Sequence, residues 1–182
     1  HRVEIGKRLG RRVAARKLIE AAGIDYTFLR PAYFMQNFST TLRRDIAEND
    51  RVYLPSGKAE FTIVDLKDVG EVAARILIEP FKFCNTGMDL TNEERLNFSE
   101  MCGILSKVLG RKISHISPDL LSFFLQKRKE KVPKGMIAVM IMLHFLPRFQ
   151  AKPRISTAVE KILNRKATGF EEFVRREQHV WR

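Results

Sequence analysis

The sequence predicts an α/β protein, namely the end of a doubly wound parallel sheet that carries a mostly helical cap. The first half of the 182 residues alternates short strands, rich in β-forming side chains, with amphipathic helices. The second half shows mainly helical patterns. Hydrophobic residues make up 45% of the chain, which is enough for a packed core and argues against disorder. The length corresponds to one domain, or to one domain with a small subdomain.

The first unit is a helix, a glycine and a strand. Residues 9–22 place alanine and leucine on one face of a helix and a polar row on another. Gly23 ends this helix, as glycine commonly does. Residues 24–30 form a strand with aromatic and β-branched side chains, and Pro31 stops it. This order is half of a parallel-sheet unit.

The rest of the first half continues to alternate helices and strands. Asp65 or Asp68 caps the expected helix that runs to residue 78, and Pro80 closes it. Pro55-Ser56-Gly57 forms a turn between the expected strands at 51–54 and 61–64. The expected elements are a helix, two strands, a helix and a strand, at residues 34–47, 51–54, 61–64, 65–78 and 88–91.

The second half opens with a capping box, in which Asn97 is followed three residues later by Glu100. Its helix runs to Gly110, and residues 112–116 form a strand. Ser117-Pro118 starts another helix, with proline at the first position. An apolar helix follows at 136–145. A second capping box, Thr168-x-x-Glu171, opens a final helix that reaches Trp181.

The chain is strongly basic, with a formal net charge of +12 and a pI near 10.0. Basic stretches occupy residues 1–17 and 127–131, and neither is interleaved with the aromatic residues of a single-strand nucleic-acid platform. A solvated basic face, an anion site for a dinucleotide and a nucleic-acid surface remain open, and we favour them in that order.

Other sequence features limit the cellular location and the partners that we expect for this protein. No apolar segment follows the basic N-terminus as in a secretory signal, and the longest apolar run, 137–146, is too short for a bilayer. Cys84 and Cys102 are expected to be reduced thiols. The four histidines are scattered without metal-ligand spacing. We therefore expect a cytoplasmic protein without a metal or a membrane partner, and a homodimer is left open.

Several segments resemble the NmrA-like family of atypical short-chain dehydrogenase/reductases. Residues 18–31 are similar to the family stretch IE-x-SGLDYTILRP, and residues 33–38 to its FMQNF turn. Similar blocks follow in the family order at residues 61–69, 89–113 and 170–181. The resemblance covers residues 9–182, except that 118–155 match only as a cap of variable sequence.

The resemblance implies the C-terminal portion of a Rossmann-like fold that binds NADP or NAD. Residues 1–80 would belong to the cofactor domain and residues 81–182 to a substrate-binding cap. The implied activity is an NAD(P)H-dependent reductase of a small carbonyl or quinone substrate. Alternatives are a non-enzymatic NAD(P)-sensing regulator and, second, a basic nucleic-acid-binding module.

The sequence departs from the family in one essential motif. None of its glycines are separated by a single residue, so the G-x-G-x-x-G loop that cradles the pyrophosphate is absent. We expect that loop, and the first strands of the sheet, to lie outside these residues. The chain then supplies at most the nicotinamide and substrate end of a site.

The resemblance also implies individual site residues. Family members often place a catalytic Lys, His or Tyr eleven residues before the helix-ending glycine, which here is Arg12. Arginine is a poor general acid at neutral pH, so Arg12 is either a phosphate or carbonyl anchor or a solvated position. The turn Pro31-Ala32-Tyr33-Phe34 would line the cofactor, unless it is simply a turn packed into the core.

Gln36 and Asn37 would bind substrate or, equally, cap the next helix. His144 fits a hydrogen-bonded core histidine better than a catalyst. The methionines of the apolar helix suit a core or the wall of a pocket for a hydrophobic substrate.

Overall fold

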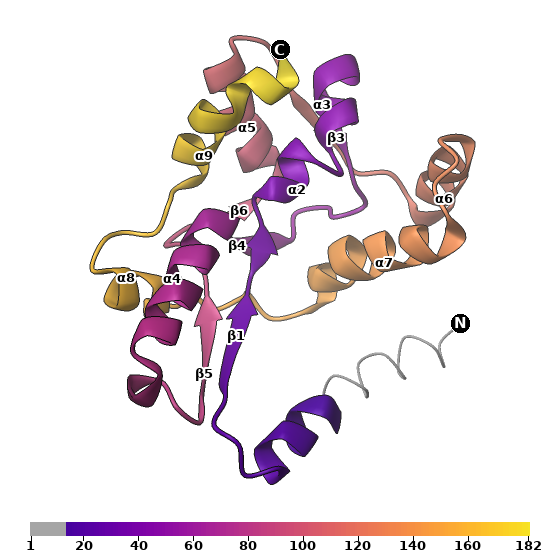
Figure 1. Cartoon of the computed structure of the whole chain (residues 1–182). Coiled ribbons are helices and arrows are strands. Elements are labelled where there is room, and N and C mark those ends of the chain that lie inside the picture. Colours follow the sequence, from indigo (N-terminus) through magenta and orange to yellow (C-terminus); the bar gives the residue numbers. More distant parts are fainter. Residues whose placement is uncertain (1–13) are drawn as a thin grey trace.

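A computed structural model describes residues 14–182, and it confirms the α/β fold class with parallel strand pairs (Figure 1). The parallel pairs are β1 (Thr27–Pro31) with β5 (Thr86–Leu90), β2 (Tyr33–Phe34) with β4 (Glu60–Val64), and β3 (Arg51–Tyr53) with β7 (Ser114–Ile116). The short β6 (Arg95–Asn97) runs antiparallel to β4. β3 and β4 flank the predicted Pro55-Ser56-Gly57 turn but do not pair with each other.

The unit that leads into the sheet has the predicted order. Residues 14–21 are helical, and Gly23 takes a φ of 66°, the left-handed conformation that glycine adopts without steric cost. β1 then pairs with β5 along one edge only. Among residues 14–182, no strand pairs with its other edge. Within the described residues, the outer edges of both β1 and β5 are therefore unpaired.

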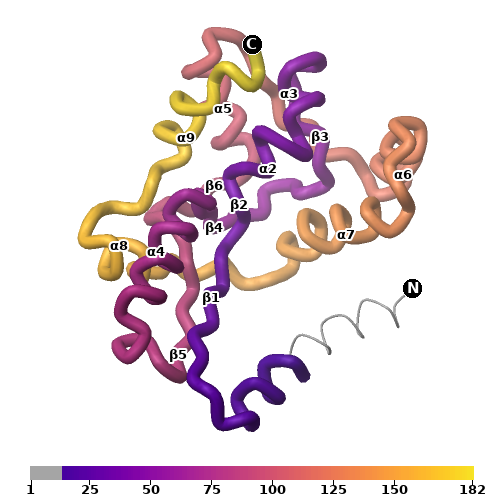
Figure 2. Tube along the Cα trace, viewed as in Figure 1, coloured from indigo at the N-terminus to yellow at the C-terminus, as the bar shows by residue number. Residues whose placement is uncertain are grey.

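The chain changes strand partner at Ala32. The Ala32 amide still donates to the carbonyl of Leu90, at the end of β5, whereas the amide of Met35 donates to Val64 of β4. β1 thus runs on directly into β2, as Figure 2 shows, while its pairing passes from β5 to β4. The turn between these strands lies at the carboxyl end of β1.

Helices surround the strand pairs. They are α2 (Gln36–Ser39), α3 (Arg43–Asn49), α4 (Leu66–Ile78), α5 (Phe98–Leu109), α6 (Leu120–Lys129), α7 (Lys134–Phe145), α8 (Ala158–Leu163) and α9 (Phe170–Glu177), with 3-10 turns η1 (Pro80–Lys82), η2 (Leu146–Phe149) and η3 (Gln178–Trp181). The buried apolar side chains form two clusters. A large cluster joins the cap helices to β3 and β4, and a smaller one joins α4 and α8 to β1 and β5.

Two predicted helix starts are confirmed. The Asp65 side chain accepts a hydrogen bond from the Lys67 amide at 2.9 Å and caps α4. Asn97 and Glu100 form the reciprocal capping box of α5. At the other end of α5, Gly110 adopts a φ of 68°. Local sequence determined these boundaries because each cap needs only neighbouring residues.

Three other helix predictions are wrong in detail. The expected helix at 34–47 is divided into α2 and α3, because Thr40 leaves the helical region with φ −121° and ψ −87°. α6 begins at Leu120 and is capped by Asp119, two residues beyond the predicted Ser117-Pro118 start. α9 begins after Gly169 and is not capped by Thr168, because the Thr168 hydroxyl donates to Asp68. The first amide of α9, that of Phe170, donates to the Glu94 side chain at 2.7 Å instead.

Within residues 14–182, no helix combines the length and the apolar character needed to cross a membrane.

Candidate functional site

The predicted cofactor-lining turn lies at the carboxyl ends of the parallel strands, where open α/β sheets bind ligands. Pro31 ends β1, Ala32 makes the change of partner, and Tyr33 and Phe34 form β2. All four residues are half-buried. Successive side chains of a strand point to opposite faces. Accordingly, Tyr33 packs against the large apolar cluster and Phe34 against the small one.

Tyr33 connects this turn to the cap through His144 of α7. The Tyr33 hydroxyl lies 3.2 Å from His144 Nε2, and His144 Nδ1 lies 2.7 Å from the carbonyl oxygen of Met140. A carbonyl only accepts, so Nδ1 carries the proton and Nε2 accepts from Tyr33. Burial lowers the pKa of His144 to about 4, which leaves it neutral. Both ring nitrogens are satisfied, as expected for a core histidine.

The ionisation state of Tyr33 completes this pair. Burial raises the pKa of the phenol well above its ordinary value, although a hydrogen bond with Asn37 acts in the opposite direction. At neutral pH the pair is therefore uncharged, and its hydrogen bond connects the cap to the turn. The rings of Phe61 and Phe98 surround it, with centroids 5.8 Å from that of Tyr33.

Gln36 takes part in internal hydrogen bonds rather than facing an open site. Its side-chain amide donates to Asp65 Oδ1 at 2.6 Å, and its carbonyl oxygen accepts from the Leu66 amide at 3.0 Å. Gln36 thus helps cap α4, whereas α2, the helix that follows the turn, has no side-chain cap. Asn37 is half-buried beside Tyr33. Substrate binding by either residue remains a prediction.

A network of buried acids beside the turn was not found by sequence reasoning. Asp65 and Asp68 are both 0% exposed. Asp65 Oδ2 lies 2.8 Å from Arg176 of α9, an ion pair without hydrogen-bond alignment. Asp68 accepts from the Thr168 amide at 2.7 Å and from the Thr168 hydroxyl at 3.0 Å. These acids hold the C-terminal segment against the start of α4.

The signal for this network was present in the sequence, since two aspartates three residues apart follow an apolar strand. Sequence reasoning weighed them only as alternative caps. The partners, residues 165, 168 and 176, come from a segment about a hundred residues away, and no local pattern connects them.

The ionisation of Asp65 makes stability depend on pH in the acid range. Burial alone would raise the pKa of this carboxyl, but Arg176, the Lys67 amide and Gln36 outweigh it and hold the pKa below the ordinary 3.8. A lowered folded-state pKa stabilises the protein above the unfolded-state pKa, and that contribution is lost as pH falls through the folded-state value. We expect Asp65→Asn to lower the urea midpoint at neutral pH and to converge with the unchanged chain in strong acid.

The urea midpoints of both chains, followed by circular dichroism from neutral to strongly acid pH, measure this difference. Arg176→Met, which removes the main counter-charge, should shrink the same pH-dependent difference. Parallel pH profiles for the Asp65→Asn variant and the unchanged chain would contradict the role given to this carboxylate.

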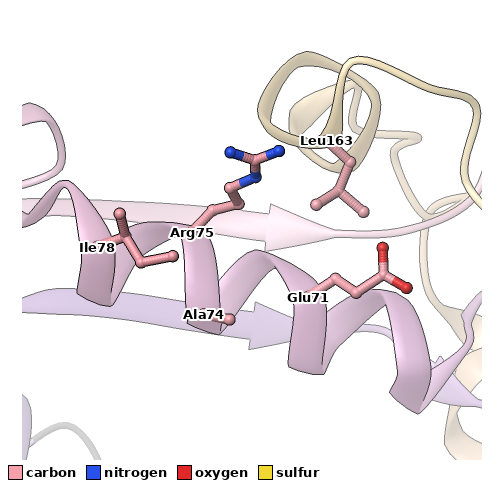
Figure 3. Close-up of a pocket in the computed structure, with 5 residues that line it drawn as sticks. All are labelled: Glu71, Ala74, Arg75, Ile78 and Leu163. Carbon is pink, nitrogen blue, oxygen red and sulfur yellow. The ribbon is translucent and has the colours of Figure 1, made fainter.

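Two surface cavities lie away from the turn. A shallow pocket of about 210 Å³ between α4 and α8 is lined by Glu71, Ala74, Arg75, Ile78 and Leu163 (Figure 3). A groove of about 340 Å³ lies at the amino end of β1, where Asp25, Tyr26 and Leu77 contribute to its wall. Neither cavity includes the predicted cofactor or substrate residues.

The remaining predictions concern the catalytic residue, a metal site and the two cysteines. Arg12, the predicted catalytic position, lies outside the described residues. Within residues 14–182, no group of three or more histidine, cysteine or acidic side chains comes together to hold a metal ion. Cys84 and Cys102 are not bonded to each other.

Comparison with known proteins identifies this architecture. The NmrA-like family matches residues 9–174. Agroclavine dehydrogenase of Claviceps fusiformis is 27% identical over 162 residues, which is 87% of this chain and 56% of that protein. The chain thus spans little more than half the length of the curated relatives it matches.

Solved structures agree with the fold. The Citrobacter sp. triphenylmethane reductase complexed with NADP(H) superposes with a TM-score of 0.79 at 21% identity, covering 91% of this chain and 57% of that protein. NmrA, a negative transcriptional regulator solved with NAD, gives a TM-score of 0.59 at 17% identity, covering 84% and 52% respectively. At these identities the structures show a common fold.

Proposed function

Because this chain belongs to the NmrA-like family, we propose that it forms the C-terminal part of an NAD(P)H-dependent reductase. It would contribute the nicotinamide side of the site, and its helical cap would hold a small carbonyl or quinone acceptor. The cofactor carries the hydride, so the task of the protein is binding, orientation and exclusion of water.

One observation carries the proposal most directly. The turn Pro31–Phe34 lies at the carboxyl end of a parallel pair whose β1 edge is unpaired within residues 14–182. Further parallel strands could add at that edge, and their carboxyl ends would then lie beside the same turn. Tyr33 joins the turn to α7, so the cap would lie over the cofactor.

The division of the chain follows from this proposal. Residues 1–80 would complete the cofactor domain and residues 81–182 would form the cap, with one exception. β5, at 86–90, pairs with β1 and would belong to the sheet. We also propose a cytoplasmic location, which the two unbonded thiols support.

A sensor without catalysis is the second candidate. The likeness to the transcriptional regulator solved with NAD favours it, as does the lack of an ionised acid–base pair among the described residues of the turn. A reductase and a sensor would both bind NAD(P), and they differ in whether NADPH is consumed.

Titration of NADPH fluorescence tests the proposal. We expect this chain to bind NADPH weakly, and a longer version with the preceding strands and glycine loop restored to bind it with micromolar affinity. The reason is that the pyrophosphate needs a glycine-rich turn at a helix N-terminus. Equal affinity of the two versions would refute the division of the site.

Substitutions in the longer version test whether the turn Pro31–Phe34 lies beside the bound cofactor. Ala32→Phe should weaken NADPH binding by at least about tenfold, because a large side chain would occupy the space beside the nicotinamide. Ala74→Phe, on the exposed face of α4, is the matched control and should bind normally. Oxidation of NADPH with a panel of quinones and aldehydes then separates reductase from sensor.

A further inference from the structure

The outer face of α6 combines exposed leucines with cations that form no ion pair within residues 14–182. Leu121 and Leu125 are 68% and 58% exposed, although side chains of this kind are normally buried. They lie four residues apart, and Arg128 and Lys129 follow Leu125 by three and four residues, so all four side chains share one helix face. Arg128 and Lys129 are both exposed.

The opposite face of α6 explains why the leucines point outward. Phe123 is fully buried and stacks on Tyr53 with ring centroids 5.9 Å apart. Lys127 is buried and binds Asp45 at 3.2 Å and Glu130 at 2.7 Å. These contacts set the rotation of the helix, so the leucine face cannot turn inward without breaking them.

The basic face continues past the end of α6. Lys131 and Lys134 are exposed, as is Met136 in the first turn of α7, at 52%. Among the described residues, none of Arg128, Lys129, Lys131 and Lys134 forms an ion pair, and the nearby Glu130 is bound by Lys127. Figure 1 shows α6 at the end of a projection away from the strands. These exposed cations and apolar side chains are therefore accessible to a partner.

We propose that this face of α6 and the following turn dock the protein on an anionic membrane surface. A lipid bilayer offers what the face lacks, an apolar layer for the two leucines and a negative surface for the four cations. Nucleic acid would match the cations but leaves the leucines in water. A second copy would cover the leucines but brings the cations of two copies together.

A peripheral contact of this kind is distinct from a membrane span. It departs from the expectation of no membrane partner, which the sequence supported through the shortness of its apolar runs. It is independent of the proposed reductase function, because no residue of the cofactor turn belongs to this face.

Sedimentation of this chain with lipid vesicles tests the proposal. We expect binding to phosphatidylcholine vesicles that contain phosphatidylserine, little binding to phosphatidylcholine alone, and weaker binding as salt increases. Lys129→Gln with Lys131→Gln should weaken binding about 25-fold, since each cation near such a surface contributes about 1 kcal/mol, or about fivefold. Leu121→Ser with Leu125→Ser should weaken it by at least about tenfold.

Matched pairs elsewhere on the surface serve as controls. Leu77 and Ile78 of α4 are 79% and 72% exposed, so changing both to serine removes as much exposed apolar surface. Lys67→Gln with Lys161→Gln removes the same charge from exposed positions. Both control pairs should bind vesicles like the unchanged chain, and circular dichroism melts verify that every variant is folded.

Several results would overturn the proposal. One is the absence of binding to the anionic vesicles, and another is binding that the α6 leucine pair does not alter. A third is equal loss in the control pairs. Tighter binding to a DNA duplex, insensitive to the leucine change, would assign the face to nucleic acid. Concentration-dependent dimers abolished by the leucine change, without vesicle binding, would assign it to a second copy.

Discussion

Replacing Asp68 with alanine is expected to destabilise the fold by about 3 kcal/mol, because the change leaves a buried donor without an acceptor. Asp68 is completely buried, and it accepts hydrogen bonds from the amide and hydroxyl of Thr168 and from Arg165. Thr168 is itself only 6% exposed, so its donors depend on this carboxylate rather than on bulk water. Urea unfolding followed by circular dichroism measures the loss.

A matched variant separates this effect from the loss of an ion pair. Glu71 binds the same guanidinium of Arg165 at 2.6 Å, but at a partly exposed position. Glu71→Ala should therefore cost at most about 1 kcal/mol, as exposed ion pairs do. If Asp68→Ala and Glu71→Ala lowered stability equally, burial of Thr168 would not be the cause.

Trp181→Ala is expected to destabilise the protein by about 3–5 kcal/mol, although the residue is next to the end of the chain. Its side chain is 1% exposed and belongs to the large apolar cluster, with the Phe173 ring centroid 6.3 Å from its own. The indole Nε1 donates to the carbonyl oxygen of Phe38 at 3.0 Å. Alanine would leave a cavity and remove this bond.

Trp181→Phe provides the graded comparison, since it keeps much of the apolar volume but loses the indole donor, and it should cost about 1–3 kcal/mol. His179→Ala, at an exposed position two residues earlier, should change the free energy of unfolding by less than about 0.5 kcal/mol. Loss of stability in the His179 variant equal to that of Trp181→Ala would indicate a general sensitivity of the C-terminus instead.

Much of the fold was readable from local patterns. Gly23, Asp65 and the Asn97–Glu100 box marked element ends correctly, because a cap or a left-handed residue depends on a few neighbouring atoms. The Thr168–Glu171 box failed for a tertiary reason. The buried carboxylate of Asp68 provides a stronger, charge-assisted partner for Thr168 than the start of α9 does.

The candidate site was only partly predictable. The position of Pro31–Phe34 at the carboxyl end of a parallel strand followed from the order of helix, glycine and strand. The hydrogen bond from Tyr33 to His144, 111 residues away, did not. Gln36 illustrates the limit, because its sequence position suited a substrate contact or a cap of the next helix, and neither pattern indicated its hydrogen bonds to Asp65 and Leu66 thirty residues away.

By itself, the amino-acid sequence determined the α/β class, the family resemblance, the absence of a glycine-rich cofactor loop from these residues, and the ends of several helices. The tertiary structure alone decided that the β1 edge is unpaired in the described chain, that buried acids hold the C-terminal segment, and that leucines of α6 face outward. The physical reason is the distance along the chain between the residues that each feature depends on. Periodicity and caps depend on neighbours a few residues apart, whereas strand pairing, burial and ion pairs depend on which distant segments meet.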